Sequence, residues 1–97
     1  MKDKIKWKKL KNIIHKISKK DIELILSTEL DSGINAATNG KDIVINGNNI
    51  KSVEMVIEAI AHELVHIVDK FEEGSIEFSS KWNEYDKIIR KKYVSKL

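Results

Sequence analysis

Residues 52–71 carry the pattern of an amphipathic helix. Apolar side chains recur in this segment at intervals of three and four positions, at Val53, Val56, Ile57, Ile60, Leu64, Ile67, Val68 and Phe71. On a helix this spacing places them along one side, which is then buried against other parts of the chain. We therefore predict one long helix with a single buried side, ended by Glu72-Glu73-Gly74.

The flanking segments predict two further helices and a small sheet. Residues 4–19 interleave lysines with single apolar residues at helical spacing, residues 21–27 approximate the alternation of a strand, and residues 42–46 form a β-branched run. A last helix is expected after a capping serine, either Ser75 or Ser79. Its apolar side comprises Phe78, Trp82, Tyr85, Ile89 and Tyr93. The expected order α-β-β-α-α defines an α+β fold.

Length and composition describe a single domain, residues 1–97. With 41% apolar and 34% charged residues, a chain of this size buries one core and has no room for a second full domain. The sequence contains no apolar run of about 18 residues, so we expect neither a membrane span nor a secretory signal. We expect a cytoplasmic protein.

Charge is distributed unevenly along the chain. Residues 1–20 contain nine lysines and one acidic residue, residues 21–86 contain four lysines and fourteen acidic residues, and residues 87–97 contain five basic residues and no acidic one. Basic ends can bind anionic partners. We nevertheless do not expect nucleic acid as a partner, because no aromatic residue beyond Trp7 belongs to a basic stacking pattern.

The long helix contains His62-Glu63-Leu64-Val65-His66, the H-E-x-x-H pattern. Two histidines four residues apart lie on one helix face, so both imidazoles can reach one metal ion. This face is turned away from the apolar side, which argues against a role for these histidines in the core. Glu63 lies about 100° further round the helix, where it can act as a general base on a water at the metal.

A catalytic zinc ion needs a third protein ligand. The chain contains no cysteine, and the one other histidine, His15, lies far upstream, so we expect a carboxylate from the segment after the motif. In an antiparallel helix pair centred on Gly74, Glu84 lies opposite the middle of the motif. A tighter turn would present Glu77 instead.

The other downstream carboxylates that are candidates for the third ligand are Asp69, Glu72, Glu73 and Asp86. Asp69 lies one turn after His66 on the same face, which suits a hydrogen bond to a ligand better than direct ligation. Glu72 and Glu73 lie at the end of the helix, where we expect them to be solvated.

The motif and its surroundings resemble a group of small zinc peptidases. The H-E-x-x-H pattern with a downstream glutamate resembles the gluzincin metallopeptidases, and Trp82-Asn83-Glu84 is similar to their Asn-Glu that carries the third ligand. Residues 35–45 resemble the strand above the active-site helix in HtpX-type and CAAX prenyl protease-type membrane peptidases. For a chain of 97 residues, the soluble group with these features is the minigluzincins. The resemblance covers residues 35–86 and departs from the family pattern at Ile88, where an aspartate is usual.

The resemblance implies a zinc metallopeptidase with a backing helix, a small sheet, an active-site helix and a C-terminal glutamate helix. Its metal ligands would be His62, His66 and Glu84, with Glu63 as general base for peptide hydrolysis by zinc-activated water. The resemblance also implies latency, with the residues after about Ile88 covering the cleft.

Two further expectations concern the substrate and a second copy of the chain. The run Ile43-Val44-Ile45 is expected to hold an extended peptide or protein substrate at a sheet edge by strand addition. The amphipathic stretch 85–97 could cover the cleft of a neighbouring copy as well as its own, which would give a homodimer through the C-terminal helix.

Two other functions remain open on the sequence. One is a non-catalytic, zinc-stabilised module that binds a partner through its basic ends. The other is a degenerate enzyme that keeps its metal without turnover. Glu63 argues for catalysis, because a purely structural zinc site needs no additional carboxylate beside the metal.

Overall fold

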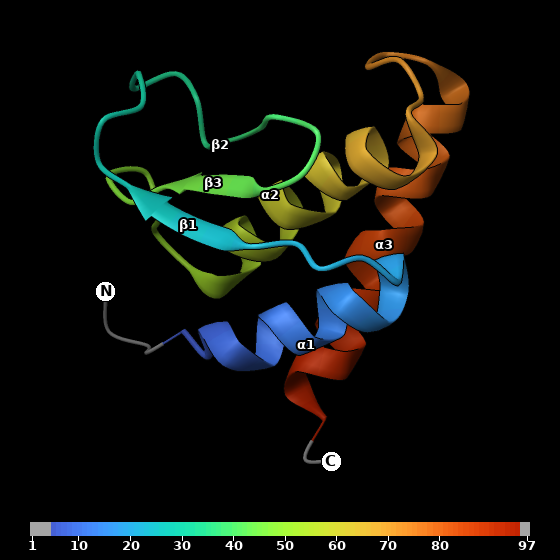
Figure 1. Ribbon diagram of the computed structural model, residues 1–97, viewed down its shortest axis with the longest axis horizontal. Coiled ribbons are helices and arrows are strands. Elements are labelled where there is room, and N and C mark those ends of the chain that lie inside the picture. Colours follow the sequence, from blue (N-terminus) through green and yellow to red (C-terminus); the bar gives the residue numbers. More distant parts are fainter. Residues whose placement is uncertain (1–4, 96–97) are drawn as a thin grey trace.

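Three helices pack around a small mixed sheet in the computed structural model, which describes residues 5–95 (Figure 1). The elements are α1 (Trp7–Ser18), β1 (Leu24–Ser27), β2 (Ala36–Thr38), β3 (Ile43–Asn46), α2 (Val53–Leu64), a π-helical turn η1 (Val65–Asp69) and α3 (Ile76–Val94). The α+β fold predicted from the sequence is confirmed. The strand β2 and the π-helical turn were not expected.

The sheet has the order β1-β3-β2, with β1 parallel and β2 antiparallel to β3. The prediction that Ile43-Val44-Ile45 lies at an edge is therefore wrong, because β3 is the central strand. The reason is burial: Ile43 and Ile45 are almost completely inaccessible, and a β-branched run of this kind gains most between two other strands. The free edges of the sheet belong to β1 and β2.

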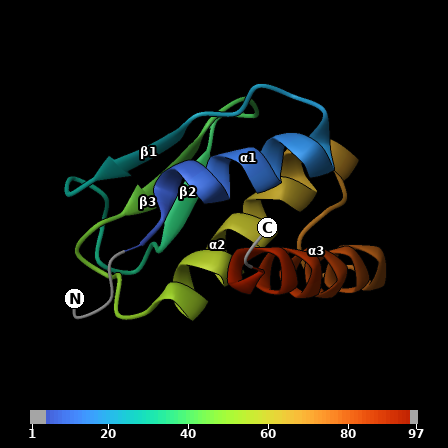
Figure 2. The same ribbon diagram turned by 90° about the horizontal axis from the view of Figure 1, so that it is seen from below.

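The helix α2 is the centre of the molecule. It contacts β2 and β3 as well as α3, and α1 packs against α3, as Figure 2 shows. All layers contribute to one core, whose fully buried side chains include Leu10, Ile14, Ile43, Ile45, Ile60, Leu64, Phe78 and Ile89. The apolar sides predicted for the helices are the ones that the structure buries.

Caps define where the helices begin and end. Ser52 accepts a hydrogen bond from Met55 N at 3.3 Å, and Ser75 accepts one from Phe78 N at 3.1 Å. Ser75 is thus the cap of the last helix, and Ser79 is not. The long helix ends earlier than predicted, because Lys70 adopts a left-handed conformation with φ 57°.

The C-terminal end of α3 contacts the beginning of α1. Tyr93 Oη accepts a hydrogen bond from Lys6 N at 3.0 Å, and Lys9 Nζ donates to Ser95 O. The Lys9 ammonium group also lies 5.8 Å from the centroid of the Tyr93 ring. No helix in residues 5–95 is long and apolar enough to cross a membrane.

Candidate metal centre

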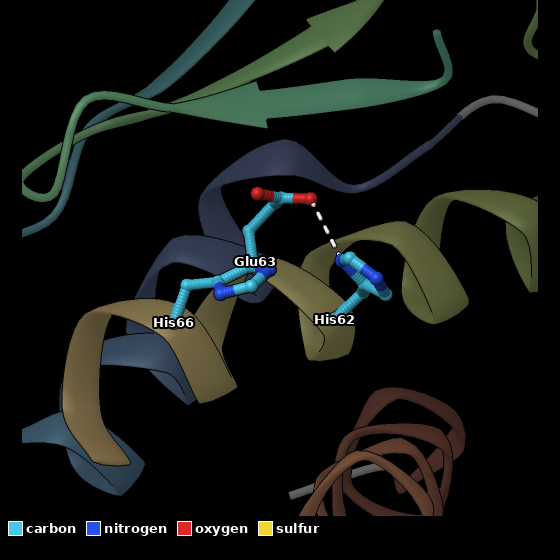
Figure 3. A group of neighbouring side chains, drawn as sticks. All are labelled: His62, Glu63 and His66. Atoms are coloured by element: carbon cyan, nitrogen blue, oxygen red, sulfur yellow. Dashed lines mark hydrogen bonds and ion pairs between the residues drawn. The ribbon is translucent and has the colours of Figure 1, made fainter. Parts of the chain in front are cut away.

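His62, Glu63 and His66 gather where α2 passes into η1 (Figure 3). One potential ligand atom from each of the three side chains lies within 4.8 Å of the others. His62 and Glu63 belong to the last turn of α2, and His66 belongs to η1. The structure therefore brings together the three residues that the sequence motif singled out, as a group that could hold a metal ion.

The π-helical turn sets the position of His66. Its closing hydrogen bond runs from Lys70 N to Val65 O at 2.9 Å, across five residues instead of four. Turns of this kind are rare in helices and are frequent at functional sites. The two imidazole rings lie with their centroids 5.1 Å apart and are inclined by 69°.

The group lies in the wall of a cavity of about 870 Å³. One side of this cavity is the edge strand β2 together with the loop before it, and the other side is formed by α2. The lining includes Ile34, Ala36, Thr38, Met55, Ala59, His62, Glu63, His66, Glu73 and Trp82. A ligand entering the cavity thus meets backbone groups of a strand, apolar side chains and the His-Glu-His group together.

Glu63 is the buried member of the group, with a residue exposure of 7%. Figure 3 shows its carboxylate pointing from α2 toward the sheet, with one oxygen 3.0 Å from His62 Nδ1. Burial raises the pKa of Glu63 above its ordinary value, and the hydrogen bond with His62 acts in the opposite direction. This pairing of Nδ1 leaves Nε2 of His62 as the ring atom available to a metal.

Aromatic side chains of α3 pack against both imidazoles. The ring of Phe78 lies 4.9 Å from that of His62 and 4.8 Å from that of His66, measured between centroids. Trp82 contacts His62 at 4.7 Å and donates from Nε1 to Glu58 O at 3.0 Å. The histidines are consequently half-buried and restricted in orientation, although they stand outside the main core.

Glu73, a downstream carboxylate expected to be solvated, contacts both histidines. Its Oε1 lies 3.1 Å from His62 Nε2 and 3.3 Å from His66 Nε2. Its side chain is 67% exposed, as expected for a solvated residue at the end of a helix. Its approach depends on the path of the loop, where Lys70 and Gly74 both have positive φ. Spacing along the sequence contains no signal for such a path.

Glu84 and Glu77 are the carboxylates that the sequence favours as third ligand. Glu84 accepts a hydrogen bond from Lys81 Nζ at 3.0 Å, and neither glutamate lines the cavity formed by the described residues. The cause is the rotation of α3, which turns Phe78 and Trp82 toward the histidines. Glu84 follows Trp82 by two positions and therefore lies about 200° away around the helix.

Two other expectations from the sequence concern Asp69 and the C-terminal segment. Asp69, expected to support a histidine, instead accepts a hydrogen bond from Tyr85 Oη at 2.7 Å. The C-terminal segment was expected to cover the cleft of its own chain. None of its described residues, 89–95, lines the cavity: Tyr93 and Ser95 contact α1, and Arg90 pairs with Glu58 of α2. Residues 96 and 97 lie outside the described part of the chain, so coverage of the cleft by this segment stays a prediction.

The donor set at the site fits zinc. Zinc binds imidazole nitrogens and carboxylate oxygens, commonly two histidines and one glutamate when a position stays open for water or substrate. Comparisons with protein-family models, curated proteins and solved structures found no match for this chain.

Proposed function

We propose that this chain is a zinc-dependent peptidase of the gluzincin type. The observation that carries the proposal is the convergence of His62 and His66 beside the buried carboxylate of Glu63, in the wall of a cavity that also exposes a strand edge. A bound zinc ion would supply Lewis-acid chemistry, lowering the pKa of water and stabilising negative charge on a carbonyl oxygen.

Glu63 is proposed as the general base and then the general acid. Its carboxylate points from α2 toward the sheet (Figure 3), and one potential ligand atom from Glu63 and from each histidine lies within 4.8 Å of the others. From there it can take a proton from an attacking water and pass it to the leaving amine. His62 holds this carboxylate in place through the 3.0 Å contact with Nδ1.

The free edge of β2 is proposed as the binding place of an extended peptide. Asn46 N donates to Asn35 O, and paired residues alternate along an antiparallel ladder. The peptide groups of Ala36 and Thr38 accordingly face away from β3, and both residues line the cavity. A substrate strand added here would run past the histidines, a role that the sequence analysis had assigned to Ile43-Val44-Ile45.

A comparison of Glu63→Gln with the wild type tests this function. We expect the zinc-loaded wild type to cleave members of a fluorogenic peptide library. The variant should lose at least about 100-fold in rate, because a positioned base contributes this much, while elemental analysis finds the same zinc content. Glu54→Gln, at an exposed position in the first turn of α2, is the matched control.

Two results would contradict the proposal. An active Glu63→Gln protein would remove the base from the mechanism. A wild type that binds zinc and cleaves no peptide would favour the non-catalytic module instead.

A further inference from the structure

We propose that Glu73, in the loop between η1 and α3, is the third metal ligand of this chain. The inference rests on the proposed metal site and specifies its ligand set. The third ligand would then be Glu73, which precedes the last helix, and not Glu84, which lies within that helix.

The distances from Glu73 to the two imidazoles agree with ligation of one metal ion. In a tetrahedral site with bonds of about 2.0–2.1 Å, neighbouring donor atoms lie about 3.3–3.4 Å apart. Glu73 Oε1 lies 3.1 Å from Nε2 of His62 and 3.3 Å from Nε2 of His66. One carboxylate oxygen thus stands at nearly the required distance from both imidazoles.

The loop holds Glu73 in this position through its backbone. Ser75 N and Ser75 Oγ both donate to Glu72 O, at 3.2 and 2.7 Å. The left-handed residues Lys70 and Gly74 reverse the chain on either side. These features turn the loop back toward the end of α2, so its carboxylate reaches the histidines.

The other carboxylates of the cavity have different partners. Three glutamates line it among the described residues, namely Glu58, Glu63 and Glu73. Glu58 accepts a hydrogen bond from Arg90 Nη2 at 3.1 Å, and Glu63 is paired with Nδ1 of His62. Only Glu73 contacts both Nε2 atoms. From α3 the site receives the aromatic rings of Phe78 and Trp82.

Zinc affinity, measured by titration against a chromophoric chelator, tests the assignment without any assay of hydrolysis. The proteins to compare are the wild type, Glu73→Gln, Glu84→Gln and Glu72→Gln. Loss of residues that merely orient a ligand costs about 10–100-fold in affinity, so we expect Glu73→Gln to lose more than about 100-fold. Glu84→Gln and the neighbouring control Glu72→Gln should bind zinc like the wild type. The absorption spectrum of the cobalt-substituted proteins should change in the Glu73 variant alone.

The possible failures are distinguishable. Wild-type affinity in Glu73→Gln would overturn this assignment and leave the metal site intact, with the 3.1 and 3.3 Å contacts then reduced to ion pairs. A loss confined to Glu84→Gln would restore the ligand expected from the sequence. A wild type that binds no zinc would overturn the metal site and this assignment together. Circular dichroism of each metal-free variant confirms that it is folded, as expected for an exposed side chain.

Discussion

At the scale of single residues, Asn46 shows how a buried polar side chain positions the edge of the cavity. It is completely buried, and its amide donates to Asp31 O at 3.1 Å and to Ile34 O at 2.7 Å. Its oxygen accepts from Asn48 N at 3.1 Å. These bonds attach the loop before β2 to the central strand of the sheet, which places β2 over α2.

Replacing Asn46 with alanine should lower the free energy of unfolding by about 2–3 kcal/mol, because the completely buried side chain is removed together with its three partly buried hydrogen bonds. Urea denaturation measures this change. Asn48→Ala is the control, since its side chain makes a solvent-exposed hydrogen bond to Thr28 O and should cost less than about 1 kcal/mol. Equal shifts in the two variants would show that Asn46 has no special role.

Residue chemistry decides which members of the site could be predicted from the sequence. His62, Glu63 and His66 lie within five consecutive positions, so a helical path through this segment is enough to predict that they lie near one another. The position of Glu73 depends on two residues with left-handed backbone conformations, Lys70 and Gly74. Lysine is not a residue type that favours this conformation, so the sequence does not predict it at position 70. The sequence could therefore place Glu73 at the end of the helix but could not predict its contact with both histidines.

At the scale of elements, the π-helical turn η1 is fixed at its end by a contact with α3. Tyr85 Oη donates to Asp69 Oδ2 at 2.7 Å. Burial, together with the hydrogen bond and the negative charge of Asp69, raises the pKa of Tyr85 well above its usual value, and Glu84 adds to the shift. The Lys81 ammonium group faces the same ring at 5.4 Å from its centroid.

Tyr85→Phe should therefore destabilise the fold by about 1–3 kcal/mol near pH 8, because Asp69 loses its partner. In the wild type the phenol stays neutral when folded but ionises near pH 10 when unfolded, so its contribution declines as the pH rises above about 10. The difference in unfolding free energy between wild type and variant should shrink over this range. A difference that stays constant between pH 8 and 11 would contradict the shifted pKa.

The elements themselves were predictable where periodicity was strong. The helices at 4–19 and 52–71 and the last helix appear close to their predicted positions, because each has one continuous apolar side. The strand β2 has only three residues, Ala36–Thr38, two of which have little preference for strands. Its formation depends on pairing with β3, a contact that no local pattern encodes. The rotation of α3 depends likewise on how Phe78 and Trp82 pack.

At the scale of the whole molecule, segments from the two ends of the sequence come together. The first turn of α1 and the last turn of α3 share the contacts of Tyr93 with Lys6 and Lys9. Both segments are rich in lysine. The C-terminal residues of the described chain therefore contact α1. The residues of α3 that face the histidines, Phe78 and Trp82, lie nearer the beginning of that helix.

Deletion of residues 93–97 should accordingly lower stability without raising peptidase activity. We expect a loss of about 1–3 kcal/mol, since a half-buried aromatic ring and its hydrogen bond are removed. Thermal unfolding and the peptide library assay measure the two effects. A rise in activity on deletion would instead support latency imposed by this segment, and light scattering would then tell whether the segment covers the cleft of a second copy.

The meeting of Lys6 with Tyr93 also has a practical consequence for engineering. Positions close to both ends of the described chain lie side by side, while the cavity opens between β2 and the beginning of α3. A reporter or a solid support attached at either position would leave the cavity accessible. The same proximity would let a short linker join the two positions in a circular permutant.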